Sequence, residues 1–477
     1  MKSSWPLRSQ SLILRSVVCS LVLAGTTLFC AATAQADSGQ WSFTGNLRFK
    51  RSGHKAASLL DGRVLVMGGS GLLTSAELYD PATGTWTVTG SLTNGRVNHT
   101  ATSLADGRVL VAGGSGAALA SAEVYDPATG MWTLTGNLNT GRSQHTATLL
   151  TNGKVLVTGG GDNLTSAELY DPATGVWTFT GSLNSGRAAH TATLLNDGRV
   201  LVVGGSGLAT AELYDPATGT WTYTGNLSTG RSLHTATLLS NGEVLVAGGF
   251  DNGDSTSAEL YDPATESWTL TGSLNAPHSQ HTASLLNDGK VLVAGGASGG
   301  GDLRTSELYD PVTGSWTLTT SLNDGRVRHT ATLLSNGEVL VAGGDGSHGL
   351  LNTAELYDFE GMTAPTVTGR GAIAGQDGSA TFNLRAVSSG DRPTGSLSFS
   401  DPAAGVAITK SKIRTLTFNG NSADLTGVAR LEDGTKVNFS VSVSDLSSDG
   451  STDTFSISLS NGYSASGTLT SGDIKIQ

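Results

Sequence analysis

Seven histidines occupy one recurring position of this sequence, and imidazoles in such numbers could bind a metal or transfer protons. Metal binding requires three or four donors that converge on one ion at about 2.0–2.5 Å. A histidine that recurs once per repeat is instead spread over successive units, where it can satisfy backbone groups at the start of a strand. We therefore predict a structural role, with no metal site and no cofactor, for the set His54, His99, His145, His190, His234, His281 and His329.

A second cation stands three residues before each of these histidines. It is an arginine in six copies and a histidine, His278, in the sixth copy along the chain. Two interpretations are open. The arginines can form a structural ring by pairing with the acids of the repeated Ala-Glu-Leu-Tyr-Asp segments, or some can face a central pocket and bind carboxylates at two points. Under the second interpretation the candidate binding residues are Arg96, Arg142, Arg187, Arg231 and Arg326.

These positions recur because most of the chain is one unit repeated seven times. Each unit has a tryptophan, and the second glycine of the next Gly-Gly doublet follows it after 28 residues in every copy. From that glycine to the next tryptophan the distance varies between 16 and 20 residues. All length changes therefore fall in one segment. A period of this size indicates a propeller or a solenoid. The tryptophans are Trp41, Trp86, Trp132, Trp177, Trp221, Trp268 and Trp316.

One copy, residues 190–225, shows the strands expected in every unit. The first predicted strand, 190–195, ends at Asp197-Gly198, a pair that favours a tight hairpin. The second, 199–203, is a run of Val and Leu typical of a strand buried on both faces. The third, 210–214, leads into an Asp-Pro-Ala-Thr-Gly turn, and the fourth begins at Trp221. Each unit is thus predicted to be a four-stranded sheet.

This pattern resembles the kelch repeat, in which a glycine doublet follows an apolar strand and a tyrosine precedes a tryptophan by seven residues. Tyr214 and Trp221 have that spacing, whereas the Gly-His and Trp-Asp signatures of the WD repeat are absent. The resemblance covers about residues 41–358 and implies an all-β fold, a seven-bladed propeller. The last unit ends after Tyr357 with no tryptophan, and Trp41 has no preceding unit. We therefore expect the N-terminal strand to complete the seventh blade within a domain spanning 37–361.

The composition changes from Met362, where the Trp and Gly-Gly signals stop and short alternating strands follow. The predicted strands are 381–385, 396–400, 414–418, 437–443 and 454–459. They indicate a second all-β domain over 362–477, a small β-sandwich or barrel. Its sequence resembles a C-terminal module found in exported bacterial proteins. An acidic loop carrying Asp445, Asp449 and Asp453 is either a solvated loop or a calcium site.

The first 36 residues have the pattern of a secretory signal peptide. Basic residues precede an apolar run from Val17 to Ala32, and Ala34-Gln35-Ala36 matches a cleavage site. We expect an exported protein that is extracellular, held at the cell surface or periplasmic, without a transmembrane segment. Both cysteines, Cys19 and Cys30, lie in the removed segment. The net charge of −11 argues against nucleic acid as a partner.

The segment of variable length is a candidate binding surface. Strands alternate in direction, so the loops between strands two and three share one face with the loops that join strand four to the next blade. Length variation on one face of a repeat array is typical of a binding surface, and it also arises by drift in exposed turns. The longest copies add residues that have no repeat counterpart: Asp251, Asp254, Asp302, Arg304, Asp345 and His348.

The leading hypothesis is a monomeric, non-enzymatic scaffold that binds a protein or a glycan through this face. Kelch adaptor propellers use arginines at a similar loop position for acidic peptides. The alternative is an enzyme, a hydrolase, lyase or oxidase, with its site in the central channel. The propeller also resembles that of the galactose oxidase family, which implies a copper site with a Tyr–Cys crosslink. That cofactor requires a cysteine, and the mature chain is expected to have none.

Overall fold

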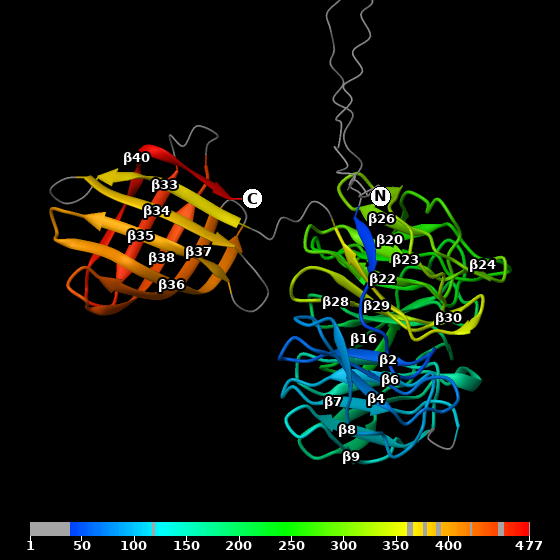
Figure 1. The fold of residues 1–477 in the computed structure, drawn as a ribbon. Coiled ribbons are helices and arrows are strands. Elements are labelled where there is room, and N and C mark those ends of the chain that lie inside the picture. The colour runs from blue at the N-terminus through cyan, green and yellow to red at the C-terminus, as the bar shows by residue number, and fades with distance from the viewer. Residues whose placement is uncertain are drawn as a thin grey trace, which may run out of the picture. The chain divides into compact units, whose positions relative to one another are not determined.

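The computed structural model describes residues 39–116, 120–359, 366–374, 379–387, 393–419, 422–446 and 453–476. The predicted signal peptide and the predicted linker, Thr363 to Pro365, lie outside these residues. The described part of the chain contains seven four-stranded sheets, two small two-stranded hairpins and one closed barrel (Figure 1). The predicted all-β architecture with a seven-bladed propeller is confirmed.

The fourth blade shows why one unit forms one sheet. Its strands are β14 Thr191–Leu194, β15 Val200–Val203, β16 Ala211–Asp215 and β17 Thr220–Tyr223, hydrogen-bonded in this order. All four residues of β15 are buried, as the Val-Leu run predicts. Gly198 has a φ of 88° in the turn before β15, a conformation that few residues other than glycine adopt easily. The predicted strand boundaries differ from the observed ones by one residue or less at most ends.

The other blades repeat this order. Blade one contains β2 Lys55–Ser58, β3 Val64–Met67, β4 Ala76–Asp80 and β5 Thr85–Val88. Blade two contains β6 Thr100–Ser103, β7 Val109–Ala112, β8 Ala122–Asp126 and β9 Met131–Leu134. Blade three contains β10 Thr146–Leu149, β11 Val155–Thr158, a short 3₁₀ turn η1 Gly161–Asn163, β12 Ala167–Asp171 and β13 Val176–Phe179. Blade five contains β18 Thr235–Leu238, β19 Val244–Ala247, β20 Ala258–Asp262 and β21 Ser267–Leu270.

The last two blades carry small extra hairpins. Blade six contains β22 Thr282–Leu285, β23 Val291–Ala294, β26 Ser306–Asp310 and β27 Ser315–Leu318, with the hairpin β24 Ala297–Ser298 and β25 Gly301–Asp302. Blade seven contains β28 Thr330–Leu333, β29 Val339–Ala342 and β32 Ala354–Asp358, with the hairpin β30 Asp345–Gly346 and β31 Gly349–Leu350. Its fourth strand is β1 Gln40–Phe43, from the other end of the propeller sequence.

Strand β1 closes the ring as predicted. It pairs antiparallel with β32, placing Trp41 opposite Tyr357, and the blue N-terminal strand lies among the later strands in Figure 1. The two rings lie 5.0 Å apart, the separation found for the Tyr–Trp pairs of other blades. Trp41 is only 9% exposed and donates a hydrogen bond through Nε1 to Ser306 of blade six. The closing strand therefore has the packing of an ordinary fourth strand.

The Gly-Gly doublet exists because the next blade packs directly against it. Gly204 has a φ of 60°, and a Cβ added there would lie 2.6 Å from the backbone oxygen of Arg231 and 2.9 Å from the His234 ring. Both contacts are closer than real Cβ atoms allow. The doublet of one blade and the Arg-x-x-His segment of the next are therefore two halves of one inter-blade contact, which explains why both recur.

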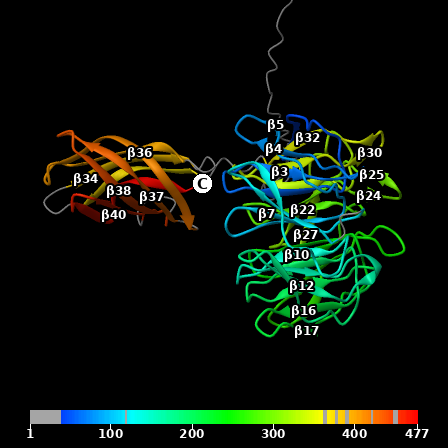
Figure 2. The same cartoon turned by 90° about the horizontal axis from the view of Figure 1, so that it is seen from below.

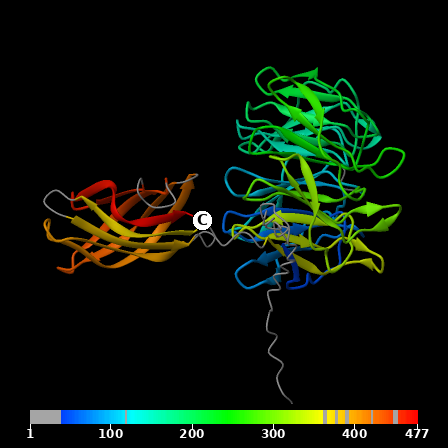
Figure 3. The same ribbon diagram turned by 90° about the horizontal axis from the view of Figure 1, so that it is seen from above.

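The C-terminal domain is a closed barrel, seen from two opposite directions in Figures 2 and 3. Alternating side chains of its strands form one hydrophobic core that includes Phe382, Phe439 and Phe455. Five of the eight strands correspond to predicted ones, and β33, β37 and β40 were not predicted. In order around the barrel the strands are β33 Thr366–Ala374, β34 Ser379–Val387, β35 Thr394–Asp401, β36 Val406–Asn419, β37 Ser422–Leu431, β38 Lys436–Ser444, β39 Thr454–Leu459 and β40 Ser464–Ile476.

Candidate functional site

The repeated arginines are buried inside the blades. Arg187 is 0% exposed, and its Nη2 donates to Oε1 of Glu212 at 2.7 Å. The remaining guanidinium hydrogens are donated to the backbone oxygens of Ser185, Gly204 and Thr210 and to the Thr210 hydroxyl. All five donors of this guanidinium are thus used within one blade. Equivalent ion pairs join Arg51 to Glu77, Arg96 to Glu123, Arg142 to Glu168, Arg231 to Glu259 and Arg326 to Glu355.

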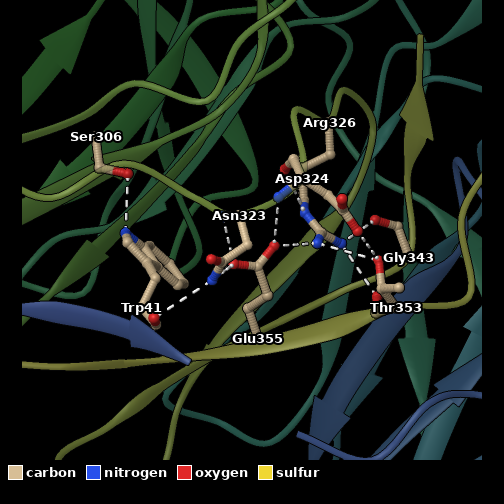
Figure 4. A network of polar contacts seen from close by, with 8 residues as sticks. All are labelled: Trp41, Ser306, Asn323, Asp324, Arg326, Gly343, Thr353 and Glu355. Carbon is tan, nitrogen blue, oxygen red and sulfur yellow. Dashed lines mark hydrogen bonds and ion pairs between the residues drawn. The ribbon is translucent and has the colours of Figure 1, made fainter. Parts of the chain in front are cut away.

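Figure 4 shows one of these networks beside the closing strand. Glu355 accepts from Arg326 and from the backbone N–H groups of Asn323 and Asp324, and the Asn323 amide donates to the backbone oxygen of Trp41. The glutamate of each blade therefore pins the loop that enters the blade. Arg96, Arg142, Arg187, Arg231 and Arg326 are at most 1% exposed, so the carboxylate-binding interpretation is corrected for these five residues: no face is open to a ligand.

His278 replaces the arginine in blade six. Its Nδ1 lies 2.7 Å from the backbone oxygen of Gly295, and its Nε2 lies 3.3 Å from Glu307. A smaller side chain therefore reaches the same two kinds of partner. The hydrogen bond to His278 and those from Asn275 lower the pKa of Glu307 although burial raises it. The pattern of one buried acid per blade is kept even where the cation changes.

The seven repeat histidines line the central channel and also join neighbouring blades. In six of the seven contacts, Nε2 lies within 2.9–3.1 Å of a threonine hydroxyl on the preceding blade, as in His190 with Thr146. Burial is the main cause that lowers the pKa of every member, to about 3 for His190, His234 and His329. The ring is therefore neutral at pH 7. These contacts support the structural interpretation of the histidines.

Lys55 interrupts this pattern. It stands where the other blades have threonine, so the histidine that it faces, His99, has no hydroxyl partner. Both ring nitrogens of His99 are buried and lack a hydrogen-bond partner among the described residues. Lys55 is exposed to the channel, and desolvation by the surrounding protein lowers the pKa of its amine. The channel thus contains one cation that the repeat does not require.

A rim of seven residues of six different types surrounds the mouth of the channel. Each rim residue precedes a repeat histidine and has a φ between 52° and 58°. Each also donates its backbone N–H to the rim oxygen of the neighbouring blade, at 2.9–3.4 Å, so the hydrogen bonds form a closed ring. Because only backbone atoms make this ring, the side chains are free to differ. In chain order the rim residues are Gly53, Asn98, Gln144, Ala189, Leu233, Gln280 and Arg328.

The rim and the histidines enclose a cavity of about 410 Å³. Its lining consists of the seven histidines, the seven rim residues, Lys55 and Thr146. No carboxylate is among these lining residues in the described part of the chain, whereas Lys55 and Arg328 are cations. Neither Lys55 nor the rim was predicted as a site. The sequence does carry the signals: one His-Lys pair among His-Thr pairs, and one unlike residue before each histidine.

The variable two-to-three loops lie beside the rim loops, on the predicted shared face, which we call the loop face. Isolated bridges join Phe250 to Ser232 and Ala297 to Ser279, so each loop contacts a loop that enters its own blade. Blades six and seven extend here as the hairpins β24–β25 and β30–β31. Arg304 and His348 are exposed, and Asp251, Asp254, Asp302 and Asp345 are partly exposed. The structure therefore places all six predicted loop residues on one face.

One of these six also has a structural contact. Asp254 of the blade-five loop accepts a hydrogen bond from the backbone N–H of Gly299 in the blade-six hairpin, at 2.9 Å. It therefore ties two neighbouring loops together. For a test of binding, Asp302, Arg304 and His348 are better positions. In the described structure the side chain of Arg304 makes no hydrogen bond or ion pair that fixes a loop, and His348 bonds only to the adjacent Ser347.

Two carboxylates at the described ends of the barrel's acidic segment accept hydrogen bonds from the backbone. Asp453 is 0% exposed and accepts from the backbone N–H groups of Leu446 and Ile474, while Asp445 accepts from Ile476. These contacts join the described ends of the segment, Asp445, Leu446 and Asp453, to one another and to β40. Asp449 lies outside the described residues.

Comparison with known proteins matches this architecture. The family model described as the kelch motif matches residues 51–93, 142–184 and 231–275, so the protein carries kelch motifs on a seven-bladed propeller. One similar solved structure is a fungal alcohol oxidase of the AA5 family in complex with copper. It has a TM-score of 0.59 and 18% identity, covering 84% of this chain and 98% of that one, and therefore shows a common fold. A search of curated proteins gives no significant match.

The described residues of this chain do not form a site for a copper ion. Among the described residues, no three His, Cys, Asp or Glu side chains are grouped closely enough to hold a metal ion. The channel histidines are distributed one per blade, and the Nε2 atoms of six of them already contact threonine. The described residues also contain no helix with the length and hydropathy needed to cross a membrane.

Proposed function

We propose that this protein is an exported, non-enzymatic interaction scaffold that binds a protein or a glycan through the loop face of its propeller. One observation carries the proposal. The only segments whose length varies between repeats gather on a single face, and in blades five to seven they add polar residues that have no repeat counterpart. Kelch propellers commonly mediate protein interactions, which agrees with this role. The export signal rests on the sequence of residues 1–36.

The channel histidines support a scaffold over an enzyme. An enzyme of the acid–base type would need catalytic groups with suited pKa values in the channel, whereas its titratable residues are a ring of repeated histidines and the cations Lys55 and Arg328. These imidazoles are buried, and six of them contact threonine across a blade interface. Their pKa values are lowered far from the range in which histidine exchanges protons near neutral pH. The repeat histidines are therefore poorly suited to general acid–base catalysis.

The test compares two faces of the same disc. Tagged mature protein, starting at Asp37, serves as bait for extracellular proteins of the native source and for a glycan array. The variant Asp302→Ala/Arg304→Ala/His348→Ala should lose the captured partner. Its melting temperature should change little, because exposed-loop substitutions usually alter stability by less than about 0.5 kcal/mol.

The matched control is Asp197→Ala/Thr218→Ala, which alters turns between strands on the other face. It should bind as the wild type does. Loss of binding in this control, with normal binding by the loop-face variant, would place the interaction on the opposite face. Export is tested separately: mass spectrometry of the secreted protein should find an N-terminus at Asp37, and an uncleaved intracellular product would contradict the proposal.

A further inference from the structure

We propose that the central cavity binds a small organic carboxylate, held by Lys55 inside the channel and by Arg328 at its rim. This site is distinct from the loop surface of the proposed function and does not depend on it. The inference starts from the two places where the channel departs from its own sevenfold pattern, the residue Lys55 and the unlike side chains of the rim.

Lys55 is not needed to build blade one. Six blades use a threonine at this position to contact the histidine of the next blade, and β2 pairs with β3 in the same register as its counterparts. Lys55 makes no hydrogen bond or ion pair within the described residues. Lys55 thus replaces a residue that makes a repeated inter-blade contact, and it places an ammonium group in the cavity. A ligand that binds this ammonium group would explain the replacement.

His99 is the residue left without its partner. It is 1% exposed, and neither ring nitrogen has a hydrogen-bond partner among the described residues. Its Nδ1 resembles those of the other channel histidines, which also lack partners, but only His99 also lacks one for Nε2. A buried polar atom without a hydrogen-bond partner is destabilising. Lys55 therefore replaces the hydroxyl that pairs with this histidine elsewhere, and its ammonium group is left for the cavity.

The cavity has the charge that an anion requires. Arg328 lies on the rim with its Nε donated to Oε1 of Gln280 at 2.5 Å, an interaction that orients the guanidinium. Its terminal nitrogens make no hydrogen bond or ion pair with another described side chain. With Lys55 and Arg328 present and no acid in the lining, the cavity is positive in a protein whose net charge is −11. Low-dielectric walls strengthen such a local field.

The donors favour a carboxylate over other ligand classes. A metal ion would be repelled by the two cations. A neutral sugar would gain little from them, and the lining offers no aromatic ring other than imidazole. A carboxylate accepts charge-assisted hydrogen bonds from an ammonium and a guanidinium, and the amides of Asn98, Gln144 and Gln280 can bind the polar remainder. A volume of about 410 Å³ lies in the range of small-molecule sites.

Isothermal titration calorimetry of the mature full chain with glutarate tests the site. The uncharged analogue glutaramide and inorganic sulfate are the two comparison probes. Glutarate should bind with a stoichiometry of one, and glutaramide should not bind at the same concentrations. Sulfate should bind at least tenfold more weakly, because it cannot place a second charged group at the rim.

The decisive variant is Lys55→Thr, which restores the residue found in the other blades. It should reduce glutarate affinity by roughly ten- to a hundredfold, the effect of losing one charged hydrogen bond. Its melting temperature should equal or exceed that of the wild type, because His99 regains a hydroxyl partner. Arg328→Gln should weaken binding by a smaller factor, because the rim is exposed. Lys154→Thr, a change to a partly exposed lysine that follows a hairpin turn of blade three, should leave binding unchanged.

Three results would overturn the proposal. The first is unchanged glutarate affinity in Lys55→Thr at a normal melting temperature. The second is equal affinity for glutarate and glutaramide, which would remove the role of charge. The third is equal affinity for sulfate and glutarate, which would show that the cavity binds anions without selectivity for a carboxylate. None of these outcomes bears on capture by the loop face, so the two proposals fail independently.

Discussion

Removing one buried guanidinium should destabilise the propeller far more than removing an exposed one. The test substitution is Arg187→Met, which keeps much of the side-chain volume. Arg187 and Glu212 are both 0% exposed and lie 2.7 Å apart. The matched control is Arg63→Met, because Arg63 forms an equally short pair with Asp61, at 2.6 Å, but the two side chains are 35% and 46% exposed.

The expected magnitudes follow from burial. In the variant, Glu212 keeps hydrogen bonds from Asn184 and Ser185 but loses its only cation, and the backbone oxygens of Gly204 and Thr210 lose a donor. Breaking a buried pair from one side costs about 3–5 kcal/mol. For a propeller of this size that corresponds to a fall of roughly 5–7 °C in melting temperature. The exposed control should lose less than about 1 kcal/mol.

Differential scanning calorimetry of both variants and of Arg187→Met/Glu212→Gln checks the reasoning. The glutamine keeps an acceptor for the loop N–H groups without an unpaired charge, so the double variant should recover part of the loss. Equal melting temperatures for Arg187→Met and Arg63→Met would refute the claim that burial gives this ion pair its importance. If the double variant recovers no stability, the loss is instead caused by the backbone oxygens of Gly204 and Thr210, which no longer have a donor.

Three further predictions concern closure, acid and copper. Trp41→Ala should cost about 3–5 kcal/mol, as much as Trp177→Ala in a middle blade, and a melting curve like that of the wild type would contradict closure by β1. Acid should destabilise the propeller: the folded pKa values of His190, His234 and His329 are about 3, below the 6.5 of a free histidine, so the unfolded chain binds more protons between these values. The stabilisation is complete above about pH 6.5 and is lost toward pH 3, by about 1.4 kcal/mol per pH unit for each histidine, so denaturant titrations should show His190→Gln with a shallower pH slope. Mature protein incubated with copper should show neither alcohol oxidation nor a crosslinked tyrosine by mass spectrometry; peroxide release on galactose would oppose this.

The blades could be predicted because several independent sequence signals indicate the same strands in each unit. The Val-Leu run marks β15, the Asp-Gly pair marks the turn before it, and the Tyr–Trp spacing marks β16 and β17, so independent local signals agree. The closing strand could be predicted by counting the repeats. The seventh unit lacks a tryptophan strand, and Trp41 stands in a strand that has no preceding unit. In the barrel, β33 and β37 carry glycines inside their strands, at Gly369, Gly371 and Gly427, and this weakens the alternating pattern on which strand prediction depends.

The candidate site was harder to predict, because a repeated polar residue has the same pattern whether it is buried or exposed. Arg187 recurs with its repeat just as a surface residue would, and only the fold brings Glu212, 25 positions away, into contact with it. The rim could not be predicted from its residue types, because it depends on a positive φ at every rim position. Leu233 and Ala189 adopt this conformation although their residue types disfavour it. Departures from a repeat, such as Lys55, were the informative positions.

The pairing of β1 with β32 also constrains the order in which the chain can fold. Trp41 and Tyr357 stand at opposite ends of the propeller sequence, so their contact is among the most distant in the protein. Six blades can form from consecutive residues as soon as each is synthesised, but the seventh waits for β32. Until then β1 and the last blade both present unpaired strand edges, which are sites for aggregation. A chain truncated before Ala354 would keep both edges open permanently, so proteolysis there should convert a soluble ring into an aggregating one.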